Sequence, residues 1–211
     1  MSELVTWLRE RIRIGRYMPG QRLIEPDLMR ETGNSRGRVR EALQRLQTEG
    51  LVVIEEFRGA SVRTFTPDDM RQIYRARMAL EGLAAHDCAA FGSDDAKTMI
   101  RDLQEQMNGC EHTGEHRRFA QLNDAWHDAI IAAADNEYLR NFIVRLRVPL
   151  YRLLFSAFYE PERIDDANAG HRQITDAIVI GDAETAERLM RAHVAEAMAV
   201  AIRLEEEMAS S

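Results

Sequence analysis

The sequence predicts a mainly α-helical protein with two domains, a winged helix-turn-helix over residues 1–66 and an all-helical antiparallel bundle over residues 67–211. Apolar residues recur at helical spacing through most of the chain, and strand-like stretches occur only between residues 51 and 64. The charge also divides the chain. Residues 1–66 hold twelve arginines and no lysine against nine acidic residues, a net charge of +3, whereas the remaining residues carry −10. This division indicates a small basic domain joined to an acidic body.

The first two helices are expected to be short and amphipathic. Residues 3–14 form the first and residues 25–32 the second, and they end at Gly15 and Gly33, because glycine readily terminates a helix. A turn-rich segment at 15–20 separates them. The apolar residues that we expect to face inward are Leu4, Trp7, Leu8, Ile12, Leu28 and Met29.

A third helix, over residues 34–48, combines an apolar stripe with a set of arginines. Ser35 is a favourable N-cap. The stripe recurs at helical spacing and contains Val39, Ala42, Leu43 and Leu46. Four arginines lie in the first turns or away from the stripe: Arg36, Arg38, Arg40 and Arg45. This arrangement fits a DNA recognition helix, whose first turns contact bases and phosphates in the major groove. Periodicity alone fits a basic helix exposed to solvent equally well.

Two short strands are expected after this helix. Residues 51–54 are apolar, residues 55–59 form a turn, and residues 60–64 form the return strand. Two tightly joined helices followed by a two-stranded ribbon make a winged helix-turn-helix.

From Pro67 onward the sequence predicts only helices. Thr66, Pro67, Asp68 and Asp69 form a strong helix start. Breaks rich in Gly, Pro and Asp-Asn then divide the chain into helices at 67–91, 94–112, 115–134, 137–158, 161–180 and 183–208. No apolar run approaches the roughly 18 residues of a membrane span, so we expect a cytoplasmic protein without a membrane partner. Cys88 and Cys110 lack metal-type spacing and are expected to be free thiols.

Three histidines in the bundle can meet at a metal site. Asn123 and His127 are four residues apart and share a helix face. His171 and His193 lie on the last two helices, roughly 15 and 18 Å from the turn at Gly181, so antiparallel helices place them side by side. Neutral imidazoles suit a divalent transition metal, with zinc or nickel expected. Spacing alone also fits histidines that are ordinary core or surface residues.

Residues 4–63 resemble the winged-helix domain of the GntR family of bacterial transcription regulators. The matching segments are PGQRLIE at 19–25, SRGRVREALQRLQTEGLV at 35–52 and RGASV at 58–62. One departure is Gly37-Arg38, where FadR-type members often have Thr-Pro. The resemblance implies DNA contacts from the third helix and the wing, namely from Ser35, Arg36, Arg38, Arg40, Arg45, Arg58 and Gly59.

Residues 70–204 resemble the FCD effector domain of FadR-type GntR regulators. The matching residues include Arg77, Leu80-Glu81, the segment 123–127, His171 and His193. Metal-binding FCD domains have an acidic ligand where this chain has Asn123, which implies a neutral, weaker fourth ligand. The resemblance also places Arg77 in the effector cavity as a carboxylate clamp, although a salt bridge to Glu81 is an equal alternative. Arg147 and Tyr151 are weaker effector candidates, and their helix face could instead cover a dimer seam.

These observations favour a DNA-binding transcriptional regulator, more commonly a repressor in such families. It would bind a short palindromic duplex as a homodimer and respond to a small anionic metabolite, expected to carry a carboxylate. A metal-dependent hydrolase or lyase using the three histidines is the alternative, although the sequence contains no HExxH motif. A third reading keeps the histidines as purely structural residues.

Overall fold

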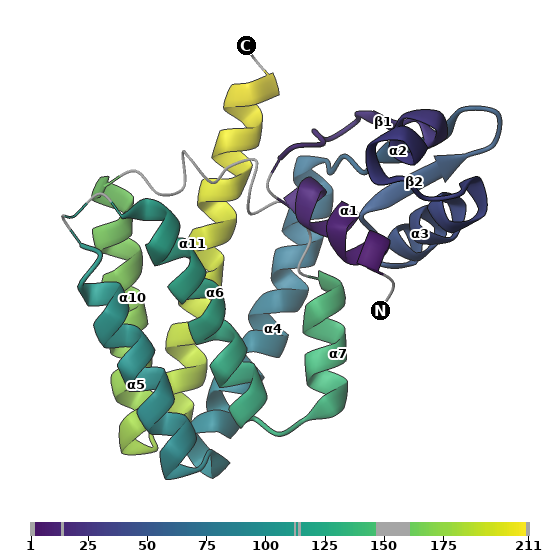
Figure 1. Cartoon of the computed structure of the whole chain (residues 1–211). Coiled ribbons are helices and arrows are strands. Elements are labelled where there is room, and N and C mark those ends of the chain that lie inside the picture. The colour runs from purple at the N-terminus through teal and green to yellow at the C-terminus, as the bar shows by residue number, and fades with distance from the viewer. Residues whose placement is uncertain (1–2, 14, 112, 114, 147–160, 210–211) are drawn as a thin grey trace. The chain divides into compact units, whose positions relative to one another are not determined.

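The computed structural model describes residues 3–13, 15–111, 113, 115–146 and 161–209 of the chain (Figure 1). They form two compact units, one ending at Thr66 and the other beginning at Pro67. The first unit is the N-terminal domain, and the second is the bundle.

The N-terminal domain packs three helices around one core. They are α1 (Glu3–Arg13), α2 (Glu25–Thr32) and α3 (Arg36–Thr48). Gly33 ends α2 in the left-handed region, with φ 68°, and its N–H donates to the Met29 carbonyl. The tight turn to α3 is therefore fixed by backbone conformation. The apolar core contains Leu4, Val5, Leu8, Ile12, Leu28, Val39, Ala42, Leu43 and Leu46, in agreement with most of the predicted inward positions.

A three-stranded antiparallel sheet completes the domain, in the order β1-β3-β2. The strands are β1 (Arg22–Leu23), β2 (Val52–Glu55) and β3 (Gly59–Val62). β2 and β3 are the predicted wing strands, shifted by one or two residues, and Val52 pairs with Val62. The sequence did not predict β1, because two residues are too short to show an alternating pattern. At the wing tip Phe57 is 98% exposed with φ 62°.

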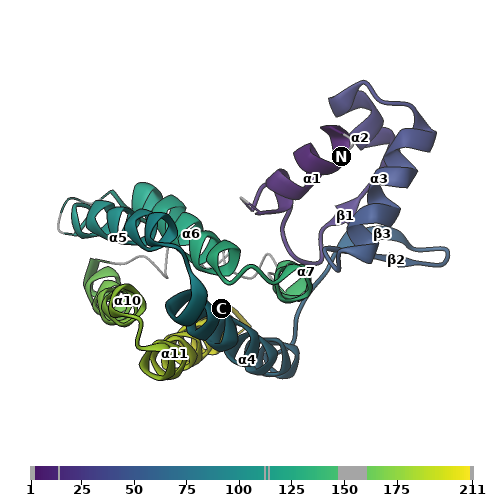
Figure 2. The ribbon, with the colours of Figure 1, turned by 90° about the horizontal axis from the view of Figure 1, so that it is seen from below.

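The bundle contains six described helices, as the sequence predicts. They are α4 (Pro67–Phe91), α5 (Asp94–Asn108), α6 (His116–Ala133), α7 (Glu137–Leu146), α10 (Pro161–Ile180) and α11 (Ala183–Ala209). α11 runs along α4, α5 lies beside α6, and α10 contacts both α5 and α11 (Figure 2). α5 ends four residues before its expected end, where Gly109 caps it. The predicted continuation of α7 to residue 158 lies outside the described residues.

The bundle core is apolar except for one group of buried polar side chains. The largest buried side chains there include Trp126, Tyr74, Phe119 and Met70. Among them lie Arg77, Glu81, Gln104, Asn168, His171 and Thr175. Because a buried polar side chain is costly unless it has a partner, this group of residues indicates a binding site in the bundle.

The structure also bears on the two cysteines and on membrane-spanning helices. Cys88 and Cys110 are both buried and free. Of the helices that the structure describes, none has the length and apolar character needed to cross a bilayer.

Candidate functional site

Three helices of the bundle bring His127, His171 and His193 together. One potential ligand atom from each ring lies within 4.8 Å of the other two. The ring centroids of His171 and His193 are 4.4 Å apart, and those of His127 and His193 are 5.6 Å apart. The predicted convergence of these residues is therefore observed, and we call this group the histidine cluster.

Local features of α10 and α11 explain why His171 and His193 can lie so close together. Gly181 takes φ 80° at the turn between the two helices, a conformation that suits glycine, so the helices can run back along each other. On α10, Gly170 faces His193, and a Cβ atom at position 170 would lie 3.3 Å from His193 Nδ1. Gly170 therefore leaves room for the His193 ring.

Burial keeps the imidazoles of His171 and His193 neutral. Burial lowers the pKa of His171 well below its ordinary value, and the neighbouring His193 and His127 lower it further. Desolvation, followed by the proximity of His127, lowers the pKa of His193 to about 3, although Glu81 acts in the opposite direction. Neutral imidazole is the form that binds a metal ion.

The cluster fits a transition-metal ion. Both ring nitrogens of the fully buried His171 have no hydrogen-bond partner among the described residues, an arrangement that is costly unless a ligand supplies one. Trp126 stands edge-on to the rings of His127 and His171, with centroid distances of 4.9 and 4.8 Å. Three nitrogen donors in an aromatic surround suit zinc, nickel or copper better than magnesium.

A buried ion pair lies next to the histidine cluster. Arg77 and Glu81, one turn apart on α4, are almost fully buried, and Arg77 Nε donates to Glu81 Oε1 at 2.7 Å. The other carboxylate oxygen, Oε2, lies 3.2 Å from His127 Nδ1. Glu81 therefore links Arg77 to the cluster, and a carboxylate in that place can fix the orientation of the His127 ring.

The roles of the other residues predicted for this site stay predictions. Asn123 is half-buried on α6, one turn before His127, and its role as a fourth ligand stays a prediction. Arg77 forms the salt bridge that the sequence offered as an alternative, and its contact with an effector also stays a prediction. Arg147 and Tyr151 lie outside the described residues.

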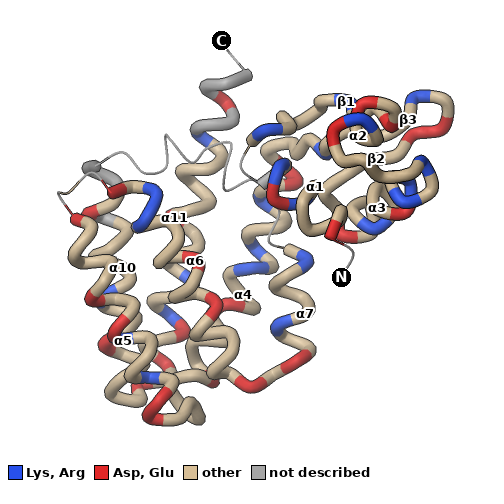
Figure 3. Tube along the Cα trace, viewed as in Figure 1, with Lys and Arg blue, Asp and Glu red and all other residues tan. Residues whose placement is uncertain are grey.

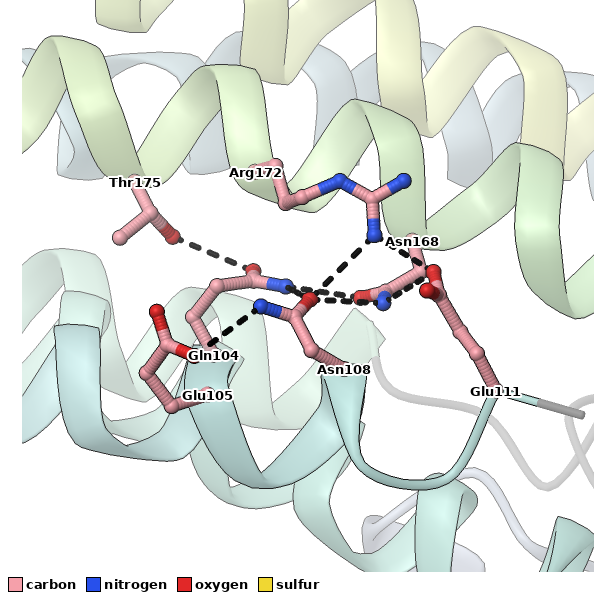
Figure 4. Close-up of polar contacts among 7 residues, drawn as sticks. All are labelled: Gln104, Glu105, Asn108, Glu111, Asn168, Arg172 and Thr175. Carbon is pink, nitrogen blue, oxygen red and sulfur yellow. Dashed lines mark hydrogen bonds and ion pairs between the residues drawn. The ribbon is translucent and has the colours of Figure 1, made fainter. Parts of the chain in front are cut away.

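A chain of polar side chains starts at Trp126 and continues between α10 and the α5 segment, where Figure 4 shows it from Thr175 to Glu111. Trp126 Nε1 donates to Thr175 Oγ1 at 3.0 Å, and Thr175 Oγ1 donates to Gln104 Oε1 at 3.3 Å. Gln104 then donates to Asn168, and Asn168 donates to Glu111 at 2.7 Å. Since this chain crosses from α6 through α10 to α5, it fixes the helix that carries His171.

Four arginines of the N-terminal domain lie close together on α3 (Figure 3). Arg36, Arg38, Arg40 and Arg45 are all exposed, as a DNA-reading helix requires. Ser35 occupies the predicted N-cap position, but its side chain makes no capping hydrogen bond. Ser35 therefore lies at the predicted N-cap position without a side-chain capping bond.

One carboxylate that the sequence analysis did not single out holds two of these arginines. Glu25, the first residue of α2, accepts from Arg36 Nε at 2.8 Å and from Arg40 Nε at 2.7 Å. These two hydrogen bonds lower the pKa of Glu25. Glu25 lies eleven residues before Arg36, so only the folded helix-turn-helix brings the residues together.

The wing carries the other predicted DNA contacts. Arg58 is exposed and pairs with Glu55 at 3.3 Å, while Gly59 begins β3 with φ 81°. The Arg58 carbonyl also accepts a hydrogen bond from the Arg22 guanidinium of β1. The unpredicted strand β1 therefore supports the turn of the wing.

Comparisons with known proteins cover both domains. Residues 72–196 match the family described as "FCD domain", and residues 2–62 match "Bacterial regulatory proteins, gntR family". A "Probable D-xylose utilization operon transcriptional repressor" of Paenarthrobacter nicotinovorans is 31% identical over 86% of this chain and 79% of its own length. The "HTH-type transcriptional repressor GlaR" of Escherichia coli (strain K12) is 26% identical over 89% of each chain. The solved structure "E. coli McbR/YncC" has the same fold, with a TM-score of 0.81, 20% identity, and 96% and 97% of the two chains covered.

Proposed function

We propose that this chain, which belongs to the GntR family of bacterial transcription regulators and carries their FCD domain, is a repressor whose DNA affinity depends on a small carboxylate-bearing metabolite. Proteins of this family regulate transcription and are not enzymes, so the hydrolase or lyase alternative is set aside. The observation that carries the proposal is the histidine cluster beside the buried Arg77–Glu81 pair.

The charges around the cluster explain the choice of an anionic effector. Burial keeps His171 and His193 neutral and the Arg77–Glu81 pair adds no net charge, so a divalent cation bound by the cluster would leave the site positive. His127, His171 and His193 would hold the ion, with Asn123 as a weak fourth ligand. When bound, zinc or nickel would supply a Lewis-acidic coordination position for a carboxylate oxygen. Arg77 would add a guanidinium for the carboxylate, and Arg147 and Tyr151 stay candidate effector contacts from the sequence.

The protein would act in the cytoplasm as a homodimer joined through residues 67–211. A twofold dimer presents two α3 helices, so its DNA target would be a short palindrome. The effector would change DNA affinity only by binding more tightly to one of two arrangements of the N-terminal domains. Residues 1–66 would thus read DNA, while residues 67–211 would sense the metabolite and hold the dimer.

Metal binding by the full chain tests the bundle half of the proposal. Titration with zinc or nickel should raise the melting temperature of the wild-type protein and leave that of His171→Ala unchanged. Asn123→Asp should bind the ion more tightly, because it adds a negative ligand, and should respond less to simple carboxylates such as citrate or lactate. If the metal-free protein takes up neither ion, the proposal of a metal site is wrong. The three imidazoles would then line the effector site directly.

DNA binding by the full chain tests the other half. The Arg36→Ala/Arg40→Ala variant should lose affinity for a duplex recovered by in vitro selection with the wild type, by about 1–3 kcal/mol for each base-reading arginine. Wild-type affinity in this variant, at matched salt concentration, would remove α3 as the reading helix.

A further inference from the structure

The arginines of α3 are not independent side chains in the folded protein. Arg36 and Arg40 stand one turn apart on α3, and each donates its Nε–H to a different oxygen of the Glu25 carboxylate. Among the described residues, neither guanidinium makes another hydrogen bond, so Glu25 leaves the Nη groups of both arginines available for other contacts. The Nη pair is the part of arginine that can contact guanine O6 and N7 together.

The scaffold that holds Glu25 is rigid. Glu25 begins α2, with Pro26 directly behind it in the first turn. The turn to α3 is fixed by the φ of Gly33 and by the Asn34 side chain, which donates to the Thr32 carbonyl at 3.1 Å. The distance from the carboxylate to α3 is therefore set by backbone structure, and the two arginines adopt their conformations against it.

Stability does not explain this arrangement. The side chains of Arg36 and Arg40 are 66% and 57% exposed, and exposed ion pairs contribute little to folding. A carboxylate at a DNA-contacting surface also repels phosphate, so it lowers affinity unless it does something else. Two long side chains held in one conformation before binding lose less conformational entropy on contact with bases.

We propose that Glu25 is a positioning residue for DNA reading, which holds Arg36 and Arg40 by their Nε–H groups and directs their Nη groups toward the bases. The inference rests on α3 being the reading helix, as in the proposed function. It adds that sequence specificity depends on an acidic residue of α2 that itself faces the negatively charged DNA. Glu25 is also distinct from a competitor, a residue that merely occupies the arginines until DNA displaces it.

The Glu25→Gln variant of the full chain separates these roles. Two duplexes are compared: one recovered by selection with the wild type, and a scrambled one of equal length and composition. As a positioning residue, Glu25→Gln should weaken binding to the selected duplex about tenfold. Binding to the scrambled duplex should stay the same or strengthen, with a steeper dependence on salt, because one negative charge is gone. As a competitor, the same change would strengthen binding to both duplexes, which would overturn the proposal.

Asp27→Asn is the matched control. Asp27 also lies in the first turn of α2, but its partner is Arg30 of the same helix and not an arginine of α3. This variant removes the same charge from the same helix end, so it should retain the wild-type ratio of selected to scrambled binding. If Glu25→Gln and Asp27→Asn behave alike, Glu25 has no positioning role.

Two additional measurements keep the inference separate from the proposed function. The Arg36→Ala/Arg40→Ala variant should lose selected-duplex binding and become insensitive to Glu25→Gln. If that variant binds normally, the reading helix is misassigned; if it fails to bind while Glu25→Gln binds normally, only the inference is wrong. In the free wild type, NMR should find slowly exchanging Nε–H protons on Arg36 and Arg40, and their exchange should accelerate in Glu25→Gln. Equal exchange rates in the two proteins would overturn the proposal without any DNA.

Discussion

Both domains contain a carboxylate that holds arginine, but they place it in opposite surroundings. In the N-terminal domain, Glu25 bridges two arginines whose side chains are more than half exposed. In the bundle, the Glu81 and Arg77 side chains are 2% and 4% exposed, and Glu81 also lies against His127. The first group is largely open to solvent, whereas the second is buried beside the histidine cluster.

This difference decides what each group can do. Exposed charges interact weakly and are screened by salt, so Arg36 and Arg40 can contact DNA through their Nη groups at low cost while Glu25 holds their Nε–H groups. Buried charges interact strongly and cannot lose a partner cheaply. Folding therefore depends strongly on both partners of the Arg77–Glu81 pair, whereas the contacts of Glu25 with Arg36 and Arg40 contribute little to it.

The largest expected effect comes from breaking the buried pair. Arg77→Met leaves the Glu81 carboxylate buried without its main partner, and we expect the free energy of unfolding to fall by about 3–5 kcal/mol. Arg77→Met/Glu81→Met should cost less than the single change, because no unpaired charge remains. Urea unfolding can be followed by Trp126 fluorescence in a Trp7→Phe background. A loss of less than about 1 kcal/mol in the single variant would mean that water reaches the pair.

Acid should destabilise the metal-free bundle next most strongly. The pKa of His193 is lowered to about 3 and that of His171 well below 6.5, so between pH 6.5 and about 3 the unfolded chain binds more protons than the folded one. Stability from these residues is present above pH 6.5 and is lost as the pH falls, at up to about 1.4 kcal/mol per pH unit for each histidine.

Thermal unfolding from pH 7 to 5 measures this slope. A His171→Leu variant, which lacks one of the two groups, should have a shallower slope than the wild type. Equal slopes would mean that acid acts on the bundle elsewhere.

A smaller effect is expected from the polar chain of Figure 4. Thr175→Val keeps the shape of the side chain but leaves the buried Trp126 Nε1–H and Gln104 Oε1 without Thr175. We expect a loss of about 1–3 kcal/mol in the free energy of unfolding. Tyr17→Phe, which removes the exposed hydrogen bond from Tyr17 to Glu31, is the matched change in the other domain and should cost less. A similar loss in both variants would contradict the role given to burial.

The two domains also differ in how much the sequence revealed of them. Helical periodicity predicted α1 to α3 and, apart from the end of α7, the bundle helices within a few residues, because the spacing of apolar residues in the sequence shows an amphipathic face. His171 and His193 were expected to meet because Gly181 implies a turn and the two residues lie at similar distances from it, while His127 was added from its spacing with Asn123 and the resemblance to FCD domains. The salt bridge of Arg77 with Glu81 could also be predicted from the sequence, since the residues are one helical turn apart.

What the sequence did not reveal depends on contacts between elements. β1 has two residues and exists only because β3 offers its edge. Glu25 meets Arg36 and Arg40 through the angle between α2 and α3, which no periodicity encodes. Gly170 appears unremarkable in sequence, and only the packing of α10 on α11 places it against His193.

The smallest expected effect concerns an ion pair of intermediate burial. Arg9 donates through Nε and Nη2 to the two carboxylate oxygens of Glu49, at 2.9 and 2.8 Å, and joins α1 to the end of α3. Both side chains are about one-third exposed, at 27% and 32%. Glu49→Gln should therefore lower stability by about 0.5–1 kcal/mol, between the exposed and the buried extremes. Because partly exposed charges are screened, the difference from wild type should shrink when the melting temperature is measured in about 1 M salt. Arg77→Met should keep its full effect in the same salt. If both variants respond equally to salt, exposure is not what separates the electrostatics of the two domains.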